Sequence, residues 1–162
     1  MNSLLANRFA LTAAHCCESI EANKQAVFFG TSKLVDRNAI RLDIESFRIH
    51  EEYKTEHFVN DICLIRFKQT VEYTEEVFPI CFAEEDMNSG EHGYIAGWGL
   101  TKEGGFQSSV LREAVVPIVP LDHCNSTYNG IINSNQYCAG FEDGEIDACK
   151  ELFLNGKTNI IN

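Results

Sequence analysis

Residues 11–16 read Leu11-Thr12-Ala13-Ala14-His15-Cys16, an apolar run that ends on a histidine and a cysteine. A second stretch, Asn60-Asp61-Ile62-Cys63-Leu64, places an acid at the entrance to another apolar run. A histidine among small residues is, taken alone, more often structural than catalytic. A carboxylate entering a buried strand, however, needs a partner to offset its desolvation, and an imidazole is a suitable one. We therefore expect His15 and Asp61 to lie together.

Such a pair has a known chemical use. A buried aspartate bonded to one ring nitrogen fixes the histidine tautomer, which leaves the other nitrogen free to take a proton from a hydroxyl. Covalent catalysis also requires a nucleophile for this base to activate. The pair alone therefore indicates part of a hydrolytic site.

The hydrophobic periodicity predicts short strands separated by turns, and long amphipathic helices are missing from the pattern. The expected strands cover residues 25–30, 40–49, 62–67, 93–97 and 110–119. One short helix is expected within residues 120–128, with Asp122 near its start, where a carboxylate is electrostatically favoured. A polar break predicts a subdomain boundary near residues 84–92. The fold class is therefore predicted to be all-β, and barrels or a sandwich would both satisfy the pattern.

Length and composition limit the possible functions. A chain of 162 residues that is 44% hydrophobic can bury a core in one domain or two small subdomains. The net charge of -11 opposes binding to nucleic acid and to anionic membranes. No segment approaches the roughly 20 apolar residues that span a bilayer, and no clean signal peptide is evident. We expect neither nucleic acid nor a membrane as a partner.

The cysteines indicate an oxidising compartment, because seven of them are dispersed through the chain. Zinc is a weaker alternative, since there is no C-x-x-C pair and the adjacent Cys16 and Cys17 are poorly placed to share one ion. An odd count leaves at least one thiol without an internal partner. The cysteines are Cys16, Cys17, Cys63, Cys81, Cys124, Cys138 and Cys149.

Four motifs in one order make a family resemblance specific. They are LTAAHC at 11–16, NDICLIRF at 60–67, AGWG at 96–99 and DACK at 147–150. In this order they resemble the motifs of the trypsin-like (chymotrypsin-fold) serine proteases, and the similarity runs from about Asn2 to Lys150. The resemblance implies two six-stranded antiparallel β-barrels, the first lacking its first strands and the second truncated.

The resemblance also implies roles for three residues. His15 corresponds to the general base, Asp61 to its orienting carboxylate and Asp147 to the acid at the bottom of the primary specificity pocket. The general description of the Ser-His-Asp triad comes from this same family, so these roles are transferred with the resemblance. An acidic pocket floor favours Arg or Lys before the scissile bond through a charge-assisted contact. Without the DACK motif, Asp147 would be taken for a solvated loop acid.

Two disulfides are expected. Cys124 and Cys138 resemble the two ends of a disulfide in the second barrel of the family. A bond between Cys17 and Cys63 is a hypothesis, based on the closeness that a functional His15–Asp61 pair requires.

The other cysteines suggest missing partners. Cys16 and Cys149 match positions whose usual partners lie upstream and downstream of this sequence. Cys81 matches a position that often bonds to a propeptide or an accessory chain. We therefore expect an incomplete peptidase domain at residues 1–150, followed by a non-homologous tail at residues 151–162.

The nucleophile of the family is not found at its expected place. After Cys149-Lys150 the family continues with Gly-Asp-Ser-Gly-Gly-Pro, whereas this chain reads Glu151-Leu152-Phe153-Leu154-Asn155. Phe153 stands where the serine is expected. The sequence therefore predicts an endopeptidase by family that is inactive as written, and a non-catalytic pseudoprotease that binds or regulates other proteins is the alternative.

The remaining expectations concern ligands and location. The expected partners are a protein or peptide substrate and a protease inhibitor, and no cofactor is expected. No metal is expected either, because Thr31-Ser32-Lys33 lacks the early acidic ligand that calcium-binding relatives use. The resemblance implies an extracellular location.

Overall fold

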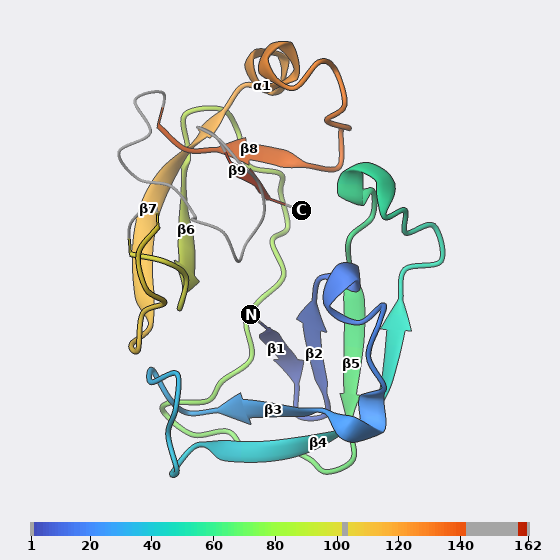
Figure 1. Ribbon diagram of the computed structural model, residues 1–162, viewed down its shortest axis with the longest axis vertical. Helices are drawn as coiled ribbons and strands as arrows, with labels where there is room; N and C mark the ends of the chain where they lie inside the picture. Colours follow the sequence, from blue (N-terminus) through green and yellow to red (C-terminus); the bar gives the residue numbers. More distant parts are fainter. Residues whose placement is uncertain (1, 102–103, 142–158, 162) are drawn as a thin grey trace. The chain divides into compact units, whose positions relative to one another are not determined.

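The computed structural model describes residues 2–101, 104–141 and 159–161 (Figure 1). The chain divides into two compact units. The first unit contains residues 1–31 and 36–84, and the second contains residues 32–35 and 85–162.

The first unit is built on a five-stranded antiparallel sheet with the strand order β1-β2-β5-β4-β3. Its strands are β1 (Ser3–Ala6), β2 (Phe9–Thr12), β3 (Ala26–Phe29), β4 (Ile40–Ile49) and β5 (Cys63–Phe67). Strand β4 serves two neighbours, because its first part pairs with β3 and its second part pairs with β5. Short 3-10 helices connect the strands: η1 (Ala14–Cys16), η2 (Ala22–Lys24) and η3 (Glu56–Phe58).

Strand β5 shows why these residues form a sheet. Its side chains alternate in burial, with Cys63, Ile65 and Phe67 buried and Arg66 exposed. This alternation is the period of two that a strand imposes on a sheet with one covered face. Arg66 reaches the Glu45 carboxylate at 3.3 Å on the outer side.

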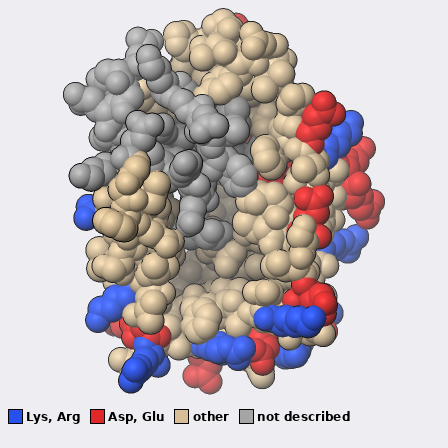
Figure 2. Space-filling model, in the orientation of Figure 1, with Lys and Arg blue, Asp and Glu red and all other residues tan. Residues whose placement is uncertain are grey.

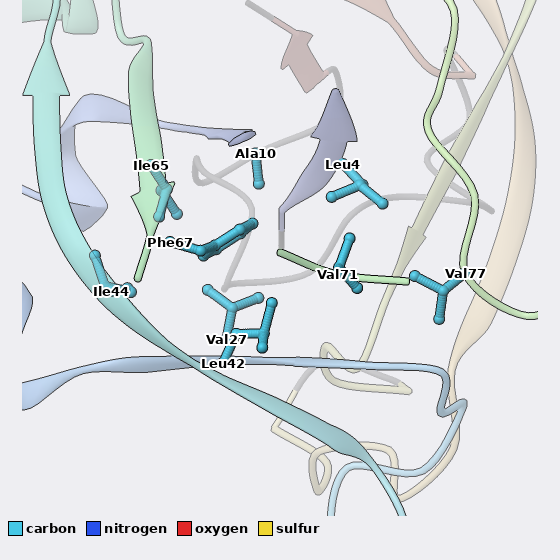
Figure 3. Packing of buried hydrophobic residues seen from close by; sticks show 9 residues of the cluster. All are labelled: Leu4, Ala10, Val27, Leu42, Ile44, Ile65, Phe67, Val71 and Val77. Atoms are coloured by element: carbon cyan, nitrogen blue, oxygen red, sulfur yellow. The ribbon is translucent and has the colours of Figure 1, made fainter. Parts of the chain in front are cut away.

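The core of the first unit gathers buried side chains from all five strands and from the segment that follows β5 (Figure 3). Phe67 is fully buried, and its ring meets the ring of Phe29 edge-on, with 5.5 Å between the ring centroids. The cluster contains Leu4, Ala10, Val27, Leu42, Ile44, Ile65, Phe67, Val71 and Val77. Apolar burial of this kind is the main stabilising contribution in a small domain.

The second unit carries a four-stranded antiparallel sheet with the order β6-β7-β8-β9. Its elements are β6 (His92–Gly97), β7 (Arg112–Val119), α1 (Leu121–Thr127), β8 (Tyr137–Ala139) and β9 (Asn159–Ile161). Val116, Ile118 and Ala139 form its buried cluster. A disulfide between Cys124 and Cys138 joins α1 to β8.

The prediction of a mostly β chain with antiparallel sheets is confirmed. Each of the five strands expected from periodicity has a counterpart in β3 to β7, and the short helix is α1. Periodicity did not predict β1, β2, β8 or β9, which have only three or four residues each. The finer prediction of two six-stranded barrels stays a prediction.

Charges of both signs mix on the surface drawn in Figure 2. Ion pairs of the first unit include Arg41 with Asp43 at 2.6 Å and Arg8 with Glu45 at 2.7 Å. Exposed pairs of this kind contribute little to stability. Within the described part of the chain, no helix is both long and apolar enough to cross a membrane.

Replacing Phe67 by alanine tests the central place of this ring in the first core. The variant F67A is expected to lose about 3–5 kcal/mol of unfolding free energy, because it leaves a cavity in a fully buried position. The control F82A truncates a ring that is 72% exposed and should change the value by less than about 0.5 kcal/mol. Urea denaturation measures the unfolding free energy of both variants. Equal losses in F67A and F82A would contradict the central place of Phe67 in the core.

Candidate active site

The sheet brings the two predicted residues to one end of neighbouring strands. Strand β2 ends at Thr12, whose partner across the ladder is Cys63, the first residue of β5. His15 follows β2 in the 3-10 turn η1, and Asp61 lies two residues before β5. Antiparallel pairing therefore explains how residues that are 46 positions apart come into contact.

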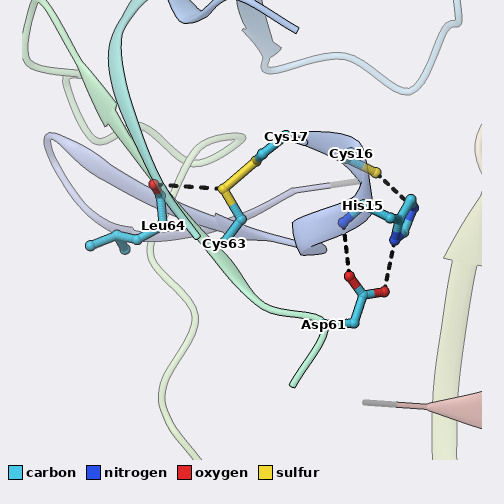
Figure 4. The surroundings of a disulfide bond; sticks show 6 residues. All are labelled: His15, Cys16, Cys17, Asp61, Cys63 and Leu64. Carbon is cyan, nitrogen blue, oxygen red and sulfur yellow. Dashed lines mark hydrogen bonds and ion pairs between the residues drawn. A yellow bond between two sulfur atoms is a disulfide. The ribbon is translucent and has the colours of Figure 1, made fainter. Parts of the chain in front are cut away.

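Asp61 bonds to His15 through both of its carboxylate oxygens (Figure 4). Its Oδ2 lies 2.7 Å from His15 Nδ1, and its Oδ1 accepts a hydrogen bond of 2.9 Å from the His15 backbone N–H. The Asp61 side chain is 3% exposed and the His15 side chain is 21% exposed. A buried ionised carboxylate accepts hydrogen bonds, so Nδ1 carries the proton that is donated to Asp61.

The other ring nitrogen faces a sulfur atom. Cys16 Sγ lies 3.0 Å from His15 Nε2, and the Cys16 side chain is exposed. The ring of Phe58 meets the imidazole edge-on, with 5.9 Å between the centroids. Sequence reasoning missed the sulfur contact, because it depends on the tight turn that brings adjacent side chains of η1 together.

A disulfide joins Cys17 to Cys63, each of which lies two residues after a member of the pair. Both cysteines are buried, and they cluster with Ala14. The structure thus contains both of the disulfides that the sequence predicts, and the second links Cys124 to Cys138. Cys149 lies outside the described residues.

The loop before Asp61 has an unusual backbone. His57, Phe58 and Asn60 have positive φ angles of 62°, 50° and 54°. Asparagine tolerates this region because its short polar side chain bonds locally, and Asn60 Nδ2 donates to the Glu52 carbonyl at 3.1 Å. Histidine is also among the residue types found there, but Phe58 tolerates the conformation less well, so surrounding contacts must hold this loop.

Tyr53 packs against the same cysteine cluster. Burial is the main cause that raises the pKa of Tyr53 above 10.0, and the negative charges of Glu18 and Asp61 add to the effect. The Thr55 hydroxyl acts in the opposite direction. Tyr53 is thus neutral at physiological pH.

This arrangement can accept a proton. A histidine with a fixed Nδ1–H can take a proton at Nε2 from a hydroxyl or thiol, and the buried carboxylate then stabilises the imidazolium.

The part of the chain that the structure describes contains no group of three or more His, Cys, Asp or Glu side chains that could hold a metal ion. Asp147 and Phe153 lie outside the described residues, so their predicted positions stay predictions.

Comparisons with known proteins agree with the motifs. A sequence model of the family described as Trypsin matches residues 1–150. The proclotting enzyme of Tachypleus tridentatus is 32% identical over 164 residues, an alignment that covers 91% of this chain. The chain spans 44% of the length of that relative.

The raised pKa of Tyr53 predicts a loss of stability in alkali. Between 10.0 and the folded pKa, the folded state keeps a proton that the unfolded chain has released, so the free energy of unfolding falls as pH rises. The contribution is complete below pH 10.0 and is lost as pH rises through the folded value.

The variant Y53F removes this ionisation and should therefore show a shallower decline than the wild type. Urea denaturation between about pH 9 and pH 11 measures how the free energy of unfolding changes with pH. The control is Y73F, which removes a hydroxyl from a side chain that is 47% exposed. Parallel declines in Y53F and the wild type would contradict the prediction.

Proposed function

Since the chain belongs to the trypsin family of serine proteases, we propose that its protein is a secreted endopeptidase that cleaves after Arg or Lys. The observation that carries the proposal is the double bond of Asp61 to His15, at 2.7 Å to Nδ1 and 2.9 Å to the backbone N–H. This geometry suits a general base with its orienting carboxylate. The roles themselves are those of the family, on which the general triad description is based.

Asp147 supports the specificity part of the proposal. It stands in the DACK motif, at the position that forms the floor of the specificity pocket in relatives. A carboxylate in a poorly hydrated slot binds the cationic end of Arg or Lys through a charge-assisted hydrogen bond. The proposed substrates are therefore proteins or peptides with Arg or Lys before the scissile bond, and protease inhibitors that present the same residues.

Several features support a secreted domain of two barrels. The five-stranded and four-stranded antiparallel sheets would each form part of one barrel. The Cys17–Cys63 and Cys124–Cys138 disulfides suit an oxidising, extracellular environment. We assign residues 1–150 to the peptidase domain, with the boundary between barrels near residues 84–92, and residues 151–162 to a non-homologous tail.

Phe153 limits what this polypeptide does. It stands where relatives have the nucleophilic serine, and a phenyl ring cannot form an acyl-enzyme. We therefore propose that the 162-residue chain does not itself hydrolyse peptides. The same observation favours the second candidate function, a pseudoprotease that binds or regulates other proteins without cutting them.

Active-site labelling tests the proposed inactivity. The purified 162-residue chain should show no covalent labelling by a fluorophosphonate, because His15 and Asp61 have no serine to activate. An active trypsin-family protease in the same assay is the positive control. Stoichiometric labelling that is abolished in H15A would refute the proposed inactivity.

Transcripts separate the two candidate functions. If the gene encodes an active endopeptidase, transcripts that span the Lys150 codon should include a form that continues with Gly-Asp-Ser-Gly-Gly. If every transcript encodes the Glu151–Asn162 sequence, the pseudoprotease is favoured.

The serine-containing form allows a test of the proposed specificity. In that form, D147N should lower kcat/KM for Arg and Lys substrates by roughly 100-fold, because a charged hydrogen-bond partner is lost. A substrate with a neutral residue before the scissile bond is the control.

A further inference from the structure

The sheet stops before it reaches the His15–Asp61 pair. The ladder between β2 and β5 ends at the pairing of Thr12 with Cys63, and His15 lies beyond that end. The backbone hydrogen bonds donated by residues 16–18 return to Ala13 and Ala14 within the same turn. The position of η1 relative to β5 is therefore set by side-chain contacts, because the backbone pairing of these strands no longer continues there.

The contacts at this place centre on the Cys17–Cys63 disulfide. Cys17 is 4% exposed, and Cys63 and Ala14 are fully buried. These three residues form a cluster of their own, separate from the main core around Phe67, with half-buried apolar residues packed against it. The disulfide is the covalent part of this small cluster, and it bonds Cys17, the residue immediately after η1, to the first residue of β5.

The loop on the Asp61 side is closed within itself by two backbone hydrogen bonds between Lys54 and Val59, at 3.0 Å and 3.1 Å, and it ends two residues before Cys63. It contains the left-handed residues His57, Phe58 and Asn60 immediately before Asp61. Left-handed conformations of residues other than glycine cost free energy and persist only where the surroundings hold them. Thr55 Oγ1 donates to the Glu18 carboxylate at 2.9 Å, but this bond is exposed to solvent. A buried covalent bond is a firmer constraint.

We propose that the Cys17–Cys63 disulfide positions the His15–Asp61 pair. It holds η1 against the start of β5, at the point where the pairing of β2 with β5 has ended. Cys17 and Cys63 are thus positioning residues. Each cysteine follows its member of the pair by two residues, so a shift of η1 along β5 would move His15 Nδ1 away from Asp61 Oδ2. The catalytic consequence of this inference rests on the proposed function, whereas the geometry does not.

Nuclear magnetic resonance of the full 162-residue chain tests the proposal without any activity assay. The observable is the His15 Nδ1 proton, which is donated to Asp61 and is assigned by its absence in H15Q. In C17A/C63A, exchange of this proton with water should become about tenfold faster or more, because local opening is no longer restrained. The amide chemical shifts of Ile65 and Phe67 should stay at their wild-type values.

The matched control is C124A/C138A, which removes the disulfide of the second unit. In this variant, exchange of the His15 Nδ1 proton should stay within about twofold of the wild type. A second variant without this disulfide, C17A/C63V, has a larger side chain at position 63. It therefore leaves a smaller cavity than C17A/C63A where the sulfur atoms were.

Three results would overturn the proposal. The first is an unchanged His15 signal in C17A/C63A, and the second is an equal change in C124A/C138A. The third is loss of all dispersed resonances of the first unit in both C17A/C63A and C17A/C63V. The disulfide would then stabilise the whole unit without a specific effect on the His15–Asp61 pair. Absence of peptidase activity in a serine-containing form would refute the proposed function and leave this measurement unaffected.

Discussion

The nearly complete burial of the Asp61 carboxylate is the constraint on which the site depends. A charge removed from water must recover its lost hydration from hydrogen bonds. His15 donates two hydrogen bonds to this carboxylate, one to each oxygen. The two bonds, from the His15 ring and from its backbone, fix the ring and the turn together. The His15 side of this contact comes from η1 and the Asp61 side from the segment that leads into β5, so both must keep their places for the carboxylate to stay hydrogen-bonded.

Much of this could be predicted because the signals are local. The strands β3 to β7 have enough residues for a period of two to be visible, and the long β4 is the clearest of them. The His15–Asp61 contact followed from the chemistry of an acid at the start of a buried strand. The Cys17–Cys63 bond was a hypothesis drawn from the closeness that a His15–Asp61 pair requires, and it forms because the 3-10 turn after β2 brings Cys17 next to the first residue of β5.

Other features could not be predicted because their causes are not local. Strands β1 and β2 have four residues each, too few for a visible period, and they are strands because β1 pairs with β2 and β2 pairs with β5. The contact of Cys16 with Nε2 depends on the backbone of a single 3-10 turn. The positive φ angle of Phe58 has no sequence signal, since phenylalanine rarely adopts it.

The engagement of both imidazole nitrogens has a thermodynamic consequence. With Asp61 at Nδ1 and the Cys16 sulfur at Nε2, rotation of the His15 ring about its own axis would break both contacts. The ring therefore loses its rotational freedom when the chain folds, and little of that entropy remains to be lost when another molecule binds. A molecule that approaches Nε2 has to displace a sulfur atom but does not have to orient the ring. A binding molecule therefore exchanges with the Cys16 sulfur at Nε2, while the orientation of the ring is already fixed.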